Sequence, residues 1–177
     1  INSFNQQIAI IANDGNGGFG AAPVDIATGG SHFYHEVDVG DVNGDGDLDV
    51  FAGGLNGGGM IFCGSQGLQF TPGPLLGDRG GDQWHPTLVD IDNDGDLDAL
   101  GTPHGPDRDS TSIQVFRNDG SGNFSNPSEY LHSPMNPYTN NLLVGDINRD
   151  GYVDLIQQPN GGGLYVWIND WDGSFTE

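Results

Sequence analysis

The sequence predicts an all-β protein made of short strands between glycine-rich turns, on the strength of three observations. First, the 177 residues include 22 Asp and 31 Gly but only 3 Glu and no Lys. Glu and Lys favour helices, whereas Asp and Gly favour turns. Second, no stretch of 12 residues shows the apolar spacing of a helix without a Gly or Pro interruption. Third, a short acidic pattern recurs three times, with apolar stretches on both sides.

The repeated pattern is nine residues long. It reads DVNGDGDLD at 41–49, DIDNDGDLD at 90–98 and DINRDGYVD at 146–154, with starts 49 and 56 residues apart. An apolar stretch before each copy predicts a first strand, at 37–39, 87–89 and 142–144. A stretch after each copy predicts a second strand, at 48–52, 97–100 and 153–156. Each nine-residue segment is therefore expected to be a loop between two strands.

Two more strands complete each unit. Third strands are predicted at 60–63, 112–117 and 164–169, and each turns into a fourth strand through 65–70, 118–124 or 169–175. The Asn-Asp-Gly in these turns tolerates positive φ and favours hairpins. At the N-terminus, residues 8–12 and the turn at 13–19 fit the third and fourth strands of a preceding unit.

Four short strands in about 50 residues are typical of a β-propeller blade. The predicted fold is one propeller-type domain of about three and a half blades: a half blade at 1–30 and blades at 31–80, 81–133 and 134–177. Closed propellers have about 4 to 8 blades, and open sheet edges invite pairing. We therefore expect either the remainder of a longer propeller or self-association, in which two copies supply about seven blades' worth of strands.

The loops predict three calcium sites. Oxygen ligands at every second position can wrap one hard cation, and carboxylates and amides suit Ca²⁺. The predicted ligands are Asp41, Asn43, Asp45, Asp49 and the carbonyl of Asp47 in loop one; Asp90, Asp92, Asp94, Asp98 and the carbonyl of Asp96 in loop two; and Asp146, Asn148, Asp150, Asp154 and the carbonyl of Tyr152 in loop three. Gly46, Gly95 and Gly151 allow the bend within each loop.

Two alternatives to these calcium sites fit the sequence less well. An EF-hand needs a Glu at position 12 and flanking helices, but position 12 is Ala52, Gly101 or Gln157 and the flanks resemble strands. Acidic turns without a metal would place three or four carboxylates close together with no compensating charge. Loop two has four side-chain carboxylates among its predicted ligands, one more than each of the other loops, so its site is predicted to bind calcium most tightly.

The loops and their flanks resemble the FG-GAP/VCBS repeat, the blade unit of integrin α-subunit propellers and of some lectins. The matching segments are VGDVNGDGDLDVFAGG at 39–54, LVDIDNDGDLDALG at 88–101, VGDINRDGYVDLI at 144–156 and the NDGxGxF turns that start at Asn13 and Asn118. This resemblance implies a propeller in which the loop joins the first two strands of a blade and calcium is structural. It does not imply a ligand.

Aromatic, His and Asn residues precede the loops at similar offsets, and the candidate ligand-binding residues are Tyr34, His35, Trp84, His85, Tyr138 and Asn140. Aromatic faces beside polar donors can hold a sugar. The same residues could instead pack between blades. A polysaccharide-lyase reading would use His85, His104, Tyr138 and Arg108, but no catalytic spacing supports it, so no catalytic residue is assigned.

Because the chain begins at Ile1 without a signal-peptide pattern, we expect a processed or excised piece. The formal net charge of −21 repels phosphate and excludes nucleic acid and anionic membranes as partners. No apolar run approaches the ~20 residues that insert in a bilayer. The predicted function is an extracellular, non-enzymatic calcium-binding module for adhesion or recognition of glycan or matrix. The alternatives are a self-assembling subunit of a surface layer or fibre and a fragment of a polysaccharide lyase.

Overall fold

The computed structural model describes residues 8–26, 33–55, 58–77, 82–104, 112–125, 129–132, 139–159 and 162–177. This part of the chain contains strands and no helix, which confirms the all-β prediction. It therefore holds no helix that could cross a membrane.

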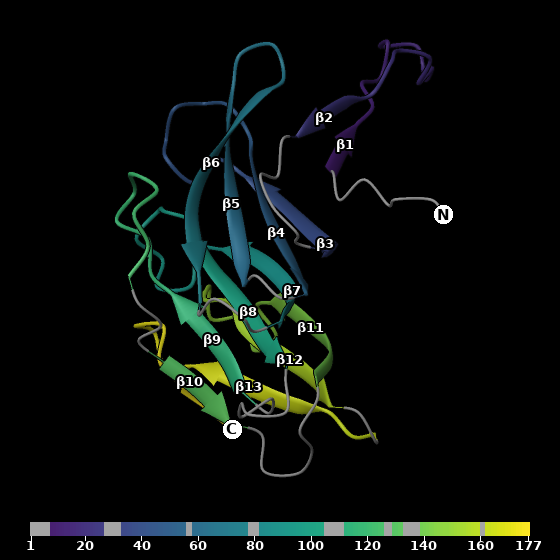
Figure 1. Cartoon of the computed structure of the whole chain (residues 1–177). Helices are drawn as coiled ribbons and strands as arrows, with labels where there is room; N and C mark the ends of the chain where they lie inside the picture. Colours follow the sequence, from purple (N-terminus) through teal and green to yellow (C-terminus); the bar gives the residue numbers. More distant parts are fainter. Residues whose placement is uncertain are drawn as a thin grey trace.

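Every strand pairs antiparallel with its neighbour in sequence, so the chain folds as a series of meanders (Figure 1). The N-terminal pair consists of β1 (Ile8–Ile10) and β2 (Val24–Ile26). Sheet 1 consists of β3 (Phe33–Gly40), β4 (Asp49–Leu55), β5 (Gly59–Ser65) and β6 (Gln69–Leu76). Sheet 2 consists of β7 (Asp82–Val89), β8 (Asp98–His104), β9 (Ser112–Phe116) and β10 (Glu129–His132). Sheet 3 consists of β11 (Thr139–Gly145), β12 (Asp154–Pro159), β13 (Tyr165–Asn169) and β14 (Phe175–Thr176).

The first strand of each sheet is longer than predicted and includes several of the aromatic, His and Asn residues that precede the loops. His35 lies in β3, His85 in β7 and Asn140 in β11. In each strand the register shifts beside these residues: between Tyr34 and Glu36, between Trp84 and Thr87, and between Thr139 and Asn141. Such an irregularity breaks the alternation of apolar and polar residues on which strand prediction depends.

Three apolar cores lie between successive sheets rather than within one. Between sheets 1 and 2, Phe51 and Ile61 pack with Ala99 and Phe116. Between sheets 2 and 3, Leu100 and Val115 belong to the same cluster as Leu155 and Trp167. Between the N-terminal pair and sheet 1, Ile26 joins Val50 and Phe62. Full burial of one such side chain contributes about 1.5–3 kcal/mol, so each sheet depends on its neighbours for stability.

Polar contacts join the first strands of adjacent sheets. The Asp38 carboxylate in β3 accepts a hydrogen bond from the Leu88 backbone N–H in β7, at 2.8 Å. The Glu36 carboxylate in β3 lies 2.8 Å from the backbone nitrogen of His85 and 2.9 Å from its Nδ1. His85 Nε2 lies 3.2 Å from the Thr139 carbonyl of β11. His85 therefore links the first strands of all three sheets.

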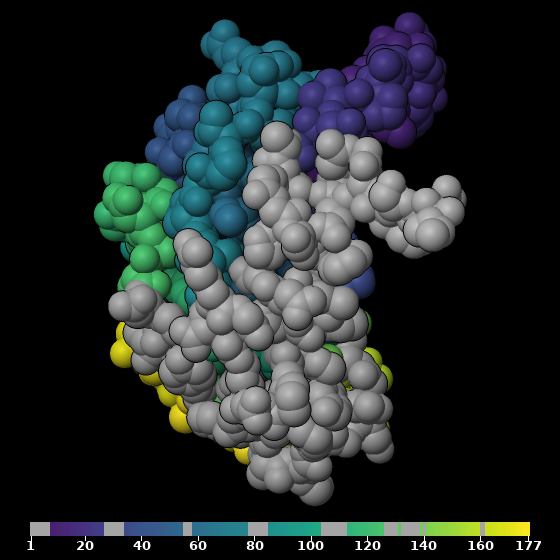
Figure 2. Space-filling view, in the orientation of Figure 1, coloured from purple at the N-terminus to yellow at the C-terminus, as the bar shows by residue number. Residues whose placement is uncertain are grey.

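The N-terminal pair lies at one end of the molecule and sheet 3 lies toward the other (Figure 2).

Cys63 in β5 is partly buried, and burial raises the pKa of its thiol.

Candidate metal centre

Each acidic loop connects the first and second strands of a four-stranded sheet. Loop one follows β3, loop two follows β7 and loop three follows β11. The ninth residue of each loop, Asp49, Asp98 or Asp154, is also the first residue of the second strand. The glycine at position six has a φ of +89° in Gly46, +98° in Gly95 and +94° in Gly151, a backbone conformation that other residues adopt with strain.

The first aspartate of each loop organises the bend. Asp41 Oδ1 accepts a hydrogen bond from the Gly44 N–H at 2.8 Å, and Oδ2 accepts one from the Gly46 N–H at 2.9 Å. The corresponding Oδ2 atoms of Asp90 and Asp146 accept bonds from the N–H of Gly95 and Gly151, both at 3.0 Å. The side chain at position one therefore fixes the loop backbone around itself.

The last aspartate of each loop is buried and connects the loop to the third strand or, in sheet 2, to a residue just after it. Asp98 Oδ2 accepts a hydrogen bond from the Ile91 N–H at 3.2 Å, and Oδ1 accepts one from the Asn118 N–H at 2.8 Å. Asp49 and Asp154 make the corresponding bonds in their own sheets. Burial raises the pKa of Asp49, and it raises the pKa of Asp98 to about 6.

Loop two brings three carboxylates into one cluster. One oxygen from each of Asp90, Asp92 and Asp98 lies within 4.8 Å of the others. Asp92 Oδ1 is buried, and it has no hydrogen-bond partner within the described part of the chain. Asp94 is not in this cluster; its Oδ1 accepts a bond from the Asp96 N–H at 2.9 Å.

Asp92 also forms an ion pair that no spacing in the sequence predicts. Its Oδ2 lies 2.6 Å from Nη1 of Arg117, which follows β9. Nη2 of the same guanidinium donates to the carbonyl of Gly173 at 2.8 Å, in the turn between β13 and β14. Arg117 therefore joins loop two to sheet 3 and offsets one of the four carboxylates on which the predicted affinity order rests.

Asn118 and Asn169 connect neighbouring loops, and sequence reasoning missed this role. Asn118 Nδ2 donates to the Val42 carbonyl in loop one at 2.7 Å and to the Leu97 carbonyl in loop two at 2.9 Å. Asn169 Nδ2 makes the matching bonds to loops two and three, with the carbonyls of Ile91 at 2.7 Å and Val153 at 3.0 Å. The available signal is the Asn at the start of both turns, a residue that hairpin formation alone would also favour.

Sheet 1 differs at the corresponding position, which is Gly64. Its N–H bonds Asp49 Oδ1 at 2.7 Å, as the N–H groups of Asn118 and Asn169 do in their sheets. A Cβ at Gly64 would lie 2.1 Å from the Leu48 carbonyl oxygen. The described N-terminal pair has no acidic loop for an asparagine to reach.

The candidate ligand-binding residues have mixed positions. Tyr34 is partly buried, and its ring packs edge to face on Phe62 with centroids 5.8 Å apart at 82°; burial raises the pKa of Tyr34. His85 makes the contacts between first strands given above, whereas His35 is exposed. Trp84 and Asn140 lie in β7 and β11, but their side chains, and all of Tyr138, are outside the described residues. Of the proposed lyase residues, only the side chain of His85 is described.

Together, the four-stranded sheets and the loop that each carries at the same place define a repeat protein. The sequence matches the family model of the FG-GAP-like repeat at residues 1–52, 41–101 and 105–157. The chain therefore belongs to the FG-GAP-like repeat family. Each match ends within the second strand of a sheet, β4, β8 or β12. The family is generally non-enzymatic. No curated protein matches the sequence.

Proposed function

We propose that this chain is an extracellular, calcium-stabilised β-propeller module that serves adhesion or recognition, with glycan or matrix as its partner. The observation that carries the calcium part is the cluster of Asp90, Asp92 and Asp98 with the buried, unpartnered Asp92 Oδ1. A buried carboxylate oxygen without a donor is costly, and a bound cation would remove that cost.

The residues fit Ca²⁺ in their chemistry, because all of the proposed ligands present oxygen atoms. In loop two, Asp90, Asp92 and Asp98 would hold the ion together with Asp94 and the carbonyl of Asp96. Loops one and three would use the same positions, with Asn43 and Asn148 in place of Asp92. Two carboxylates about 4 Å apart repel each other by about 1 kcal/mol in water and about 4 kcal/mol near a protein surface. The positive charge of the ion would offset this repulsion.

The proposed role of calcium is structural, because each loop joins strands rather than lining a cleft. The position-nine aspartate bonds both the loop and the third strand, so holding it ionised in place stabilises three strands of a sheet. The ion pair between Asp92 and Arg117 offsets one of the four ligand carboxylates of loop two, which leaves three, the number of ligand carboxylates in each of the other loops. On ligand charge alone, we propose that the three loops bind calcium with similar affinity.

The propeller assignment is supported by the repeated interfaces between sheets. The loop residues Val42 and Ile91 are 2% and 1% exposed because the next sheet covers them. Their counterpart in sheet 3, Ile147, is 45% exposed, as expected where no further sheet packs on it within the described residues. This exposed face also favours a second candidate function, self-assembly, which sedimentation velocity with and without a chelator would test.

Recognition is supported by the register shifts in β3, β7 and β11. Such irregularities re-aim side chains and are frequent next to active sites, and they lie beside His35, His85 and Asn140 in the three first strands. His35 is exposed, whereas Tyr34 packs on Phe62 and His85 lies between first strands, so His35 is the residue chosen to test recognition.

The calcium part is tested by titrating chelator-treated protein with Ca²⁺ in a calorimeter and by thermal unfolding. We expect three bound ions and a higher melting temperature, because a ligand at 100 times its Kd adds about 2.7 kcal/mol per site. A thermal transition that calcium does not move would refute the ligand assignment. Recognition is tested on a glycan array with His35→Ala as the comparison; an array that stays blank for the wild type would refute the glycan partner.

A further inference from the structure

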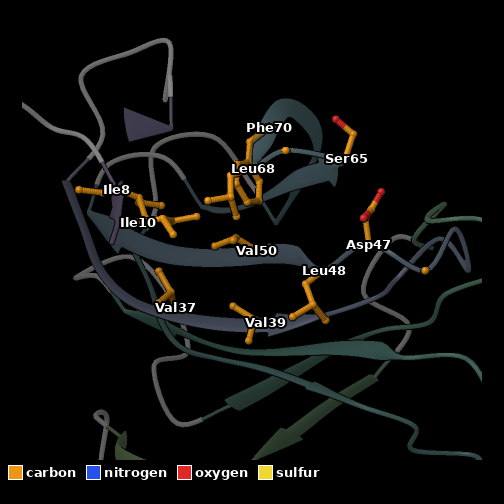
Figure 3. Close-up of a pocket in the computed structure, with 13 residues that line it drawn as sticks. Ile8, Ile10, Val37, Val39, Asp47, Leu48, Val50, Ser65, Leu68 and Phe70 are labelled. Atoms are coloured by element: carbon orange, nitrogen blue, oxygen red, sulfur yellow. The ribbon is translucent and has the colours of Figure 1, made fainter. Parts of the chain in front are cut away.

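An apolar groove of about 610 Å³ runs between the N-terminal pair and sheet 1 (Figure 3). Ile8 and Ile10 of β1 line one side, and Val37 and Val39 of β3 line the other. Leu48 at the end of loop one extends the same apolar lining toward Asp47.

The groove is an uncovered part of an interface that the chain buries elsewhere. Val37 and Val39 are 51% and 54% exposed. In sheet 2 the corresponding residues, Pro86 and Leu88, are buried and partly buried. Leu88 is covered by the first two strands of sheet 1. It packs in the cluster that contains Phe51 of β4, and a Cβ on Gly40 of β3 would come within 3.3 Å of Leu88 Cδ1. What the groove lacks is therefore the first two strands of a sheet.

The N-terminal pair has the register of a third and fourth strand. Ile8 pairs with Ile26 in this pair as Ile113 pairs with Leu131 in sheet 2. β9, the counterpart of β1, pairs with β8 on one side and β10 on the other, whereas β1 pairs only with β2 in the described chain. The free edge of β1 borders the groove and can accept a further strand.

A polar group points to the same missing element. Asn13 corresponds to Asn118, and its Oδ1 accepts hydrogen bonds from the N–H groups of Gly15 at 2.7 Å and Gly17 at 3.3 Å. Asn118 uses its amide nitrogen to bond a loop carbonyl in its own sheet. Within the described residues, the Asn13 amide nitrogen forms no such bond, because the N-terminal pair has no acidic loop there that could offer a carbonyl.

We propose that the groove is the seat of two strands and an acidic loop from a further repeat of this family. The incoming strands would pair with the edge of β1 and lay two apolar residues, the counterparts of Val42 and Phe51, on Val37, Val39 and Leu48. The loop would present a backbone carbonyl to Asn13. The inference continues the buried interface between the N-terminal pair and sheet 1 and does not depend on the recognition role proposed above.

The test supplies the missing element in the chain itself. A second copy of residues 82–105 is joined ahead of Ile1; because Asn13 corresponds to Asn118, residues 1–7 correspond to 106–112, so the spacing of a complete unit is restored. The matched control carries Ile91→Asp and Leu100→Asp in the added copy, which removes its apolar face. Hydrogen exchange of the β1 amides is measured in both proteins and in the unextended chain, all in calcium.

We expect β1 amide exchange to slow at least tenfold in the extended protein and to stay unchanged in the control. Equal exchange in the two extended proteins would overturn the proposal. The double substitution Val37→Ser and Val39→Ser should leave the unfolding midpoint of the unextended chain unchanged, since both side chains are half exposed, but should abolish the protection in the extended protein. Protection that survives this substitution would place the added strands elsewhere. If the unextended chain is a dimer with β1 already protected, a second copy fills the groove and the proposal is wrong.

Discussion

Replacing Asn118 by alanine tests whether one amide holds two acidic loops together. The side chain is 7% exposed; it donates to the carbonyls of Val42 and Leu97 and accepts a bond from the Gly122 N–H at 3.1 Å. A net contribution of about 0.5–1.5 kcal/mol per hydrogen bond gives an expected loss of about 2–4 kcal/mol. For a domain of this size, that corresponds to a fall in melting temperature of roughly 4–16 °C.

Two further variants separate this role from general disruption. Asn118→Asp has nearly the same shape and keeps the acceptor, but it places a carboxylate against two carbonyl oxygens, so it should be less stable than Asn118→Ala. Asn13→Ala removes the corresponding exposed side chain, which accepts bonds only within its own turn, and should cost about 1 kcal/mol or less. Urea unfolding in excess calcium gives the free energies. The reasoning is refuted if Asn118→Asp matches the wild type or if Asn118→Ala costs no more than Asn13→Ala.

Three other perturbations follow from the loops. Burial raises the pKa of the Asp98 carboxyl from 3.8 to about 6, so the folded chain binds this proton more tightly than the unfolded chain does. Protonated Asp98 therefore contributes stability that is fully present below pH about 4 and is lost as the pH rises through about 6. The loss is at most about 3 kcal/mol. Urea unfolding of the metal-free protein between pH 4 and 7 should show this loss, Asp98→Asn should abolish it, and an unchanged profile in that variant would contradict it. Arg117→Gln should destabilise the metal-free protein by about 1–3 kcal/mol and tighten calcium at loop two in calorimetry, because Asp92 loses its cation; weaker binding there would show that Arg117 supports the site. Gly64→Ala should lower stability by several kcal/mol, since its Cβ would meet the Leu48 carbonyl at 2.1 Å, whereas Gly20→Ala, with open space around it, is the neutral control in thermal unfolding.

Local features were predictable from the sequence because neighbouring residues determine them. The loops depend on bonds such as those from Asp41 to Gly44 and Gly46, three and five residues away. The glycine bends and the alternation of strands and turns are local in the same sense, so the all-β prediction and the FG-GAP assignment were correct. The extra length of β3, β7 and β11 was missed because the register shifts interrupt the pattern that marks a strand.

Contacts between sheets were not predictable from one sequence. Asn118 reaches a carbonyl 76 residues away and Asn169 one 78 residues away. Arg117 contacts Asp92, 25 residues before it, and Gly173, 56 residues after it. These partners become neighbours only when whole sheets stack, and no spacing rule along the chain encodes that stacking. For the same reason, the sequence could not distinguish a core role of Tyr34 from a ligand-binding role.

The difference between Gly64 and the two asparagines means that the repeats are not interchangeable parts. In a tandem array lengthened by duplicating sheet 2 or sheet 3, each added sheet would carry the asparagine that bonds the loop of the sheet before it. In an array lengthened with copies of sheet 1, every added interface would lack this asparagine, because Gly64 stands at its position. Each of these interfaces would be the first to separate under mechanical load. Asparagine or glycine at this one position therefore provides a rule for building longer arrays from this chain.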